Sequence, residues 1–312
     1  MLLIITNRDD LTADFLITRL IELKKSYFRL NSEDLSEAQI HFDATNKSLS
    51  RSITVAGKML DFASVTCVWY RRKLWVQSAA IIKEEQQRFV AGEIISLIEG
   101  LIADPAILWV NPMDAVTLAE RKVFQLRVAQ QLGFRIPQTL ISNEPDQLRN
   151  FYNTHKGKVI CKPIFHGLFI SGNERAAVYT RRVKDDDLIN DSQLRACPTF
   201  LQREIPKGSD VRVTFIGDTV FSVEILSQSK LLDWRCMKEQ LSYRLYDVDG
   251  NVQNLCRLML RKLNLAFGAF DFVRTEAGEL YFLEVNPTGE WAWLERELEF
   301  PMRDALIKLF GI

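Results

Sequence analysis

The sequence predicts a mixed fold, with an α/β unit at the N-terminus and two α+β units after it. The chain begins with strand, helix and strand, the order that is typical of a small parallel sheet. Near the C-terminus, two apolar segments flank a short turn, which indicates a β-hairpin. The 312 residues, of which 47% are hydrophobic and 26% charged, suggest enough core for about two domains.

The first unit is predicted from apolar runs and from apolar residues at helical spacing. Residues 2–6 form a continuous apolar strand, and residues 12–23 carry apolar side chains at the spacing of one helix face. The other predicted elements of this unit are strands at residues 27–30, 52–55, 65–70 and 108–111 and a helix at residues 83–102. Asn111-Pro112 marks a break, so the first domain is predicted to span residues 1–112.

The middle and last units mix helices with strands in the α+β manner. A helix is predicted at residues 117–132, where Gly133 suits the residue after the helix end and Pro137 follows. The middle unit has predicted strands at residues 138–141, 158–163, 176–181 and 199–204 and a helix at residues 145–155. The last unit has predicted strands at residues 210–216 and 220–226, a helix at residues 252–263, the hairpin and a helix at residues 301–310. These patterns predict a central domain over residues 113–205 and a C-terminal domain over residues 206–312.

Charge and cysteine content disfavour several classes of protein. The 40 basic residues balance 40 acidic ones, so the chain has no bulk basic surface for nucleic acid. Five scattered cysteines without a C-x-x-C pair argue against a disulfide framework or a structural zinc site and favour reduced thiols in the cytoplasm. The sequence lacks an apolar segment long enough for a membrane span, and its short apolar start does not resemble a signal peptide.

Motifs of several enzyme classes are missing from the sequence. It contains no G-x-S-x-G, no G-x-x-x-x-G-K-[ST] and no G-x-G-x-x-G. This disfavours serine hydrolases, P-loop NTPases, protein kinases and Rossmann oxidoreductases.

The C-terminal hairpin carries three side chains with oxygen donors. Alternation along residues 280–287 puts Glu284 and Asn286 on one face, and Asp271 on the partner strand is within reach of that face. Two carboxylates and an amide oxygen suit Mg²⁺, which usually binds together with substrate phosphates. The alternative is a surface hairpin whose carboxylates bind no metal.

Four cations are candidates for phosphate binding. Lys162 follows an apolar strand, where it either binds a phosphate or extends to solvent, and Lys122 on the predicted helix is by itself a surface lysine. Arg212 shares a strand face with Asp210 and suits a γ-phosphate, as does Arg235 in the loop that follows. The alternative for both arginines is a surface salt bridge.

Two further segments are candidates for ligand contacts. The strand at residues 199–204 enters a turn, where its backbone can pair with an adenine edge and Glu204 can accept from ribose hydroxyls. Arg71 and Arg72 end an early strand, at the edge where parallel sheets bind ligands, and they can hold a substrate carboxylate by bidentate hydrogen bonds. A solvated strand end is the alternative for this arginine pair.

The order of these motifs resembles the ATP-grasp ligases over residues 111–312. The motifs are an early lysine, a strand-end Lys-Pro, Gln-Arg-Glu-Ile, Asp-Val-Arg-Val, Phe-Asp-Phe and Phe-Leu-Glu-Val-Asn-Pro. The N-terminal segments Ile-Thr-Asn-Arg-Asp-Asp, Tyr-Phe-Arg-Leu-Asn and Val-Trp-Tyr-Arg-Arg are similar to the pre-grasp domain of the microviridin-type (graspetide) peptide-maturing ligases, as is Asp233-Trp234-Arg235. The resemblance implies the ATP-grasp fold, with pre-grasp, central and C-terminal domains.

The resemblance also implies ATP and Mg²⁺ as cofactors and assigns a role to each candidate residue. The implied nucleotide-binding residues are Lys122, Lys162, Gln202, Arg203, Glu204, Ile205 and Asp210. The implied γ-phosphate ligands, and hence catalytic residues, are Arg212 and Arg235. The implied Mg²⁺ ligands are Asp271, Glu284 and Asn286. One departure concerns the loop at residues 165–172, which has only two glycines although many ATP-grasp enzymes close a glycine-rich loop over ATP.

The implied reaction activates a side-chain carboxylate of a ribosomally made precursor peptide as an acyl phosphate. A Lys amine or a Ser/Thr hydroxyl of the same peptide then attacks, giving an ω-amide or ω-ester macrocycle. The family often reads a leader peptide through its central domain, here around residues 176–195, and its members form homodimers. Two alternatives are an ATP-grasp ligase that joins amino acids or peptides without a leader peptide and a non-catalytic nucleotide-binding module.

Overall fold

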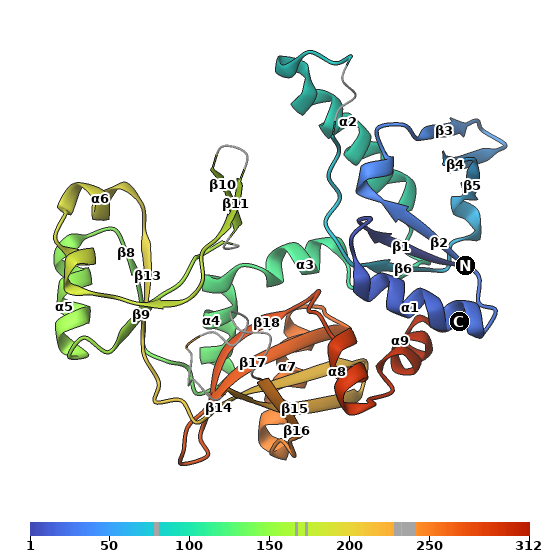
Figure 1. Ribbon diagram of the computed structural model, residues 1–312. Helices are drawn as coiled ribbons and strands as arrows, with labels where there is room; N and C mark the ends of the chain where they lie inside the picture. The colour runs from blue at the N-terminus through green and yellow to red at the C-terminus, as the bar shows by residue number, and fades with distance from the viewer. Residues whose placement is uncertain (78–80, 166–167, 172–173, 228–231, 233–240) are drawn as a thin grey trace.

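The computed structural model describes residues 1–77, 81–165, 168–171, 174–227, 232 and 241–312. Figure 1 shows the N-terminal elements from β1 to α2 in one part of the molecule, a smaller part with β8, β9 and β13, and a larger sheet from β14 to β18. Helices α3 and α4 run between these parts in the same view. None of the helices in the described ranges is long and apolar enough to cross a membrane.

The N-terminal part contains the predicted parallel sheet, in the order β2-β1-β6-β7. All of its described pairings are parallel, which confirms the prediction. Its strands are β1 (Leu2–Thr6), β2 (Tyr27–Asn31), β6 (Cys67–Tyr70) and β7 (Leu108–Val110). Its helices are α1 (Leu11–Glu22) and α2 (Glu84–Ile102), close to the predicted ranges. The β1 side chains are completely buried, as expected for a strand between two parallel neighbours.

A small antiparallel sheet in this part was not fully predicted. It contains β3 (Gln39–Ala44), β4 (Leu49–Val55) and β5 (Lys58–Asp61), of which only β4 was expected. Five of the six β3 side chains are exposed, so the strand has no apolar alternation to reveal it. Two short 3₁₀ helices, η1 (Ser32–Asp34) and η2 (Phe62–Ser64), precede β3 and follow β5.

The helix predicted at residues 117–132 is two helices, so this prediction was wrong in detail. Helix α3 covers Met113–Ala119 and α4 covers Lys122–Leu132, with Arg121 in an extended conformation between them. No glycine or proline marks this break in the sequence. The C-terminal end of α4 follows the prediction, because Gly133 adopts the left-handed conformation.

The central part has a four-stranded sheet in the order β12-β9-β13-β8. Its strands are β8 (Thr139–Ser142), β9 (Val159–Cys161), β12 (Arg181–Arg182) and β13 (Thr199–Arg203), and its helices are α5 (Pro145–Thr154), η3 (Asp185–Leu188) and α6 (Asp191–Ala196). The strand predicted at residues 176–181 is instead divided between β12 and β11 (Glu174–Ala177), which pairs with β10 (Leu168–Ser171) in a separate hairpin. That hairpin extends away from the central sheet (Figure 1).

The C-terminal part has a five-stranded antiparallel sheet in the order β16-β15-β14-β17-β18. Its strands are β14 (Ser209–Ile216), β15 (Thr219–Ser227), β16 (Leu241–Leu245), β17 (Phe267–Arg274) and β18 (Leu280–Asn286). Its helices are α7 (Gly250–Lys262), α8 (Ala292–Leu298) and α9 (Met302–Phe310). The predicted hairpin is confirmed as β17–β18, and Gly278 in its turn has a positive φ of 86°.

The two faces of this sheet pack against different neighbours. Val213, Phe215 and Phe270 face a core shared with α4 and α7. On the opposite face, Ile216 and Phe267 belong to a core shared with α1, α8 and α9. Polar side chains from β14, β17 and β18 continue this second face beyond the apolar residues, so it combines a packed region with a polar one.

Candidate active site

The three predicted metal ligands lie together on the second face of the C-terminal sheet. Asp271 is paired directly with Glu284 across the hairpin, and Asn286 is the next residue on the same face of β18. The Asn286 Nδ2 atom donates to Asp271 Oδ2 at 2.8 Å. A bulge between Asp271 and Phe272 shifts the register and allows Glu284 to lie opposite Asp271. The predicted convergence of these three side chains is therefore present.

Arg212 on β14 lies beside Asp271, so Arg212, Asp271 and Glu284 form a polar row across three neighbouring strands. It is the direct partner of Asp271, to which its Nε and Nη2 atoms donate at 2.9 Å each. An ionised carboxylate has about four lone-pair positions, of which Arg212 and Asn286 occupy three at Asp271. A metal ion bound to Asp271 would take the fourth position.

The donor set fits a hard divalent cation such as Mg²⁺. In the described part of the chain, no group of three or more His, Cys, Asp or Glu side chains could hold a metal ion. A site here therefore depends on the amide oxygen of Asn286 in addition to the carboxylates of Asp271 and Glu284. Mg²⁺ commonly binds through one or two carboxylates and completes its shell with substrate phosphates and water, which this set permits.

Lys122 contacts the site from α4, and Lys162 adjoins a residue that Lys122 contacts. Lys122 begins α4, and its Nζ atom lies 3.7 Å from Glu284 Oε2 and donates to the carbonyl oxygen of Pro163 at 3.0 Å. Lys162 follows β9, and its Nζ atom lies 4.9 Å from the centre of the Phe200 ring. Because Pro163 adjoins Lys162, the contact of Lys122 brings the two lysine segments close together.

The segment Gln202–Ile205 uses much of its hydrogen bonding within the central sheet. The backbone N–H groups of Arg203 and Glu204 donate to Gln138 and Lys158, each at 2.9 Å. An adenine edge paired with this segment would use other backbone groups. The Glu204 carboxylate accepts from Arg182 at 2.7 and 2.9 Å, so a ribose hydroxyl would share it with that arginine.

Two of the remaining candidates for nucleotide binding, Gln202 and Asp210, have partners within the chain. Gln202 is fully buried and donates from Nε2 to Thr139 Oγ1 at 2.9 Å. Asp210 lies on the same face as Arg212, one row farther along β14, and forms an ion pair with Lys207. Arg235 lies outside the described residues, as do Asp233 and Trp234 of the same motif.

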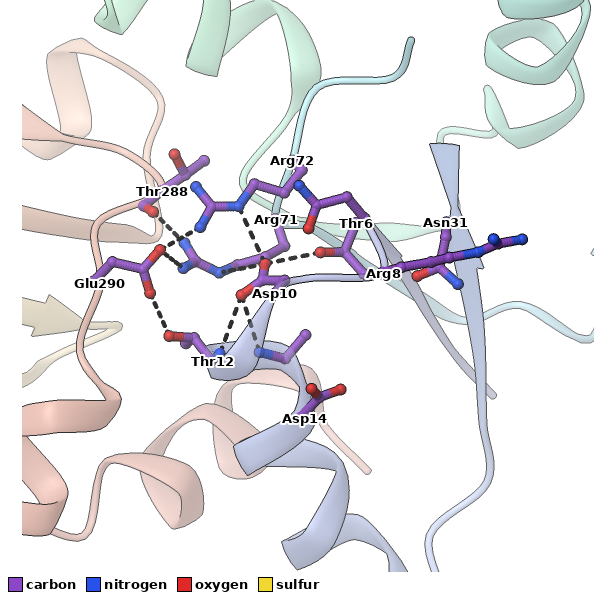
Figure 2. Close-up of polar contacts among 12 residues, drawn as sticks. Thr6, Arg8, Asp10, Thr12, Asp14, Asn31, Arg71, Arg72, Thr288 and Glu290 are labelled. Carbon is purple, nitrogen blue, oxygen red and sulfur yellow. Dashed lines mark hydrogen bonds and ion pairs between the residues drawn. The ribbon is translucent and has the colours of Figure 1, made fainter. Parts of the chain in front are cut away.

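Arg71 and Arg72 bind carboxylates of this chain (Figure 2). The Nε atoms of both arginines lie 3.2 Å from Asp10 Oδ2, and both side chains also form ion pairs with Glu290. Arg71 is buried, whereas the side chain of Arg72 is 36% exposed. The observed partners are carboxylates of this chain, and binding of a substrate carboxylate stays a prediction.

The cluster of Asp10, Arg71, Arg72 and Glu290 makes folding stability depend on pH. Burial raises the pKa of Asp10, but the charges of Arg71 and Arg72 outweigh it and hold this pKa below its usual range. The folded state therefore binds fewer protons at Asp10 than the unfolded state, so the stabilisation is complete above a pH of about 4 and is lost as the pH falls through the folded pKa.

We expect Asp10→Asn to lower the free energy of unfolding at pH 7 and to reduce its fall on acidification. Urea unfolding measured between neutral and acidic pH tests this, with the exposed neighbour Asp9→Asn as the control that keeps the wild-type pH profile. Parallel pH profiles for wild type and Asp10→Asn would contradict the assignment.

Gln125 and Asn111 are two site-supporting residues that were not predicted. Gln125 on α4 is buried, and it accepts from the Val285 N–H and donates to the Val285 carbonyl, each at 2.9 Å. Val285 lies between Glu284 and Asn286, so Gln125 holds the edge strand at the candidate metal ligands. Asn111, also buried, makes four hydrogen bonds, to Ala266, Phe267 and Pro287. A polar residue on the buried face of an otherwise amphipathic helix was the available signal for Gln125.

Replacing Gln125 by leucine is expected to lower the free energy of unfolding by about 2–4 kcal/mol, because buried backbone groups of Val285 and Ala119 lose their partner. Chemical denaturation measures this effect. The matched control is Gln130→Leu at an exposed position of the same helix, with an expected change within about 0.5 kcal/mol. Equal effects of the two substitutions would show that Gln125 has no special role.

Comparisons with known proteins find a family model and solved structures that are similar to this chain. Residues 1–117 match the family model described as the MvdD pre-ATP-grasp domain. The macrocyclase MdnC from Microcystis aeruginosa MRC, solved with the precursor peptide MdnA, is 27% identical, with a TM-score of 0.88 over 100% of this chain and 99% of that one. No curated protein matches the chain.

Two other solved structures cover almost the whole chain. MdnB, a macrocyclase from the same organism, is 27% identical, with a TM-score of 0.83 over 99% of this chain and 98% of that one. A RiPP-associated ATP-grasp ligase from Chryseobacterium gregarium is 22% identical, with a TM-score of 0.89 over 99% of this chain and 96% of that one, and shows the same fold. The predicted ATP-grasp fold is confirmed: the whole chain is similar to the macrocyclases MdnC and MdnB, and residues 1–117 match a pre-ATP-grasp domain.

Proposed function

We propose that the protein is an ATP-dependent peptide macrocyclase, which joins a side-chain carboxylate of a ribosomal precursor peptide to a Thr or Ser hydroxyl or a Lys amine of the same peptide. The observation that carries this proposal is the end-to-end similarity to MdnC, a macrocyclase solved with its precursor peptide. The clustered Asp271, Glu284 and Asn286 side chains support ATP chemistry at the matching part of the fold.

The first step of the proposed reaction activates the carboxylate. A carboxylate oxygen of the peptide attacks the γ-phosphorus of ATP, the bond to the β–γ bridging oxygen breaks, and ADP leaves with that electron pair. The product is an acyl phosphate, whose carbonyl carbon is a far better electrophile than that of a carboxylate. Lys122, Lys162 and Arg212 supply positive charge for the transferring phosphoryl group, with Arg235 proposed as a further ligand.

The second step closes the ring. The hydroxyl oxygen or amine nitrogen attacks the carbonyl carbon, inorganic phosphate leaves, and the nucleophile loses its proton to the released phosphate or to water. Because both groups belong to one bound peptide, proximity replaces a bimolecular encounter. The step requires no nucleophilic side chain from the protein.

Asp271, Glu284 and Asn286 would hold Mg²⁺, which supplies charge neutralisation at the phosphates when it is bound. The sheet fixes Asp271 and Glu284 opposite each other, and Asn286 is oriented by its hydrogen bond to Asp271. The backbone of residues 202–205 is proposed to contact adenine, with Asp210 positioning the nucleotide.

The proposed partner is a precursor peptide with a leader and a core segment. MdnC was solved with the precursor peptide MdnA, and the ligase from Chryseobacterium gregarium with a leader and core peptide, which supports a peptide substrate here. Residues 176–195 of the central part are proposed to contact the leader. We also propose a homodimer and a cytoplasmic location, and the free thiols of Cys67, Cys161 and Cys256 suit that reducing compartment.

The test combines the enzyme, ATP and Mg²⁺ with a short peptide encoded beside its gene and rich in Thr, Ser or Lys and in Asp or Glu. The expected product has lost one water molecule per ring by mass spectrometry, with one ADP released per ring. The core segment alone should react much more slowly than the full peptide.

Three results would contradict the macrocyclase. Ligation of free amino acids or of unconnected peptides would support the leader-independent ligase. Loss of water without ADP release would exclude the acyl-phosphate route. ATP binding with no ADP release upon addition of any peptide would support a non-catalytic nucleotide-binding module.

A further inference from the structure

The turn that follows the candidate metal strand is held by side chains from other parts of the fold. The carbonyl oxygen of Pro287 accepts from Asn111 at 2.8 Å, and that of Glu290 accepts from Arg212 at 3.2 Å. Between them, Arg71 Nη1 donates to the carbonyl oxygen of Thr288 and to that of Gly289. Four successive carbonyls directly after Asn286 therefore bond side chains outside the turn, rather than a neighbouring strand.

The turn also packs closely against the sheet. A Cβ atom on Gly289 would lie 2.7 Å from the Cβ atom of Ala269, so only glycine fits at this position. Ala269 is the direct cross-strand partner of Asn286. A shift of the turn would therefore be transmitted to the region of the sheet that carries Asn286 and Asp271.

Arg71 reaches the turn from the end of β6 in the pre-ATP-grasp domain, with its side chain only 2% exposed. Its Nε atom pairs with Asp10, its Nη2 atom with Glu290 at 2.5 Å, and its Nη1 atom with the turn carbonyls. A planar guanidinium can serve these three directions at once, whereas a lysine ammonium at the same place cannot.

The two carboxylates that neutralise Arg71 are themselves fixed by α1 (Figure 2). Asp10 caps this helix, because its Oδ1 atom accepts from the backbone N–H groups of Thr12 and Ala13 at 3.1 and 3.2 Å. Glu290 accepts a hydrogen bond from the Thr12 hydroxyl. Through Asp10 and Glu290, the N-terminal end of α1 therefore helps to fix the position of residues 287–290.

The buried pair of Arg71 and Asp10 is a poor source of net stability, since desolvation offsets the attraction between the two charges. Its contribution is geometric, because each charge fits only one arrangement of its partners. From these contacts we infer that Arg71 is a positioning residue for the candidate metal site: the pre-ATP-grasp domain sets the orientation of Asn286 by holding the turn after it. This inference rests on the proposed role of Asp271, Glu284 and Asn286.

The test measures metal binding and backbone protection in the full-length protein. Arg71→Lys keeps the charge but loses the three-way contact, so the dissociation constant for Mn²⁺ in the presence of ADP, measured by electron paramagnetic resonance, should rise about tenfold or more. Hydrogen exchange of the peptide spanning residues 287–291 should become faster. Asp10→Asn keeps the helix cap but loses the charge, and it should change both quantities in the same direction by less.

The matched control is Arg19→Lys. Arg19 on α1 also links the two parts of the chain, through bonds from Nε and Nη2 to Asp304 on α9 at 2.8 and 3.3 Å, but the described contacts of Arg19 do not include the turn. It should leave Mn²⁺ affinity and exchange at residues 287–291 at wild-type values.

The outcomes separate this inference from the proposed function. Unchanged Mn²⁺ affinity in Arg71→Lys, whether or not exchange at the turn becomes faster, would overturn the positioning role while leaving the metal site intact. An equal loss of affinity in Arg19→Lys would also overturn it. Wild-type protein that fails to bind Mn²⁺ with ADP, or a Glu284→Gln variant that binds it normally, would overturn the metal site itself.

Discussion

Replacing Glu284 by glutamine is expected to lower ADP release with a precursor peptide by about 10²–10³-fold, because a proposed Mg²⁺ ligand is lost and with it charge neutralisation at the phosphates. The glutamine side chain keeps the size of Glu284 but removes the negative charge that faces Lys122 Nζ at 3.7 Å. The site would then have one carboxylate, Asp271, in place of two. Because Glu284 is only partly buried, the free energy of unfolding should change by less than about 1 kcal/mol.

A second acidic residue of the same hairpin provides the control. Glu279 lies in the β17–β18 turn, where its carboxylate pairs with Arg135 at 2.7 Å. Glu279→Gln is the same chemical change away from the polar row, and ADP release should stay within about twofold of wild type, as expected for a surface ion pair. Near-normal ADP release from Glu284→Gln would remove Glu284 from the proposed site.

Replacing Arg212 by methionine is expected to impair both folding and reaction. The side chain of Arg212 is 6% exposed and that of Asp271 is 15% exposed, so the substitution leaves a largely buried carboxylate without its bidentate partner. Removing one member of such a pair costs about 3–5 kcal/mol of folding free energy, which urea unfolding measures. ADP release should fall as strongly as in Glu284→Gln, because positive charge near the transferring phosphoryl group is lost.

A double substitution separates these two effects. Arg212→Met combined with Asp271→Leu removes both charges, and it should recover most of the lost stability, since a buried pair can often be replaced by apolar side chains. ADP release in the double variant should stay at least as low as in Arg212→Met. Recovery of activity together with stability would mean that Arg212 and Asp271 have only a structural role.

The sequence predicted the elements whose signals are local. The pattern of β1, α1 and β2 follows from apolar periodicity, and the β17–β18 hairpin follows from alternation around a glycine turn. Strand β3 was missed because it is almost entirely exposed. The break between α3 and α4 was missed because neither glycine nor proline marks it, and the Gln125 side chain instead bonds the carbonyl oxygen of Ala119 at the end of α3.

By itself, the sequence determined which residues share a strand face: Asp210 with Arg212, and Glu284 with Asn286. A period of two residues fixes this without reference to the rest of the chain. The tertiary structure decided which of these faces meet. The bulge that places Asp271 opposite Glu284 became visible only when the strands were paired.

Tertiary structure also decided which polar residues support the site from a distance. Gln125 bonds Val285 across 160 positions of the chain, and Arg71 bonds Thr288 across 217. Apolar and polar periodicity in the sequence reveals which residues share a face, but it does not reveal contacts between residues so far apart in the chain. Such contacts depend on the packing of whole elements, which also places Arg71 and Arg72 against Asp10 and Glu290 of the same chain.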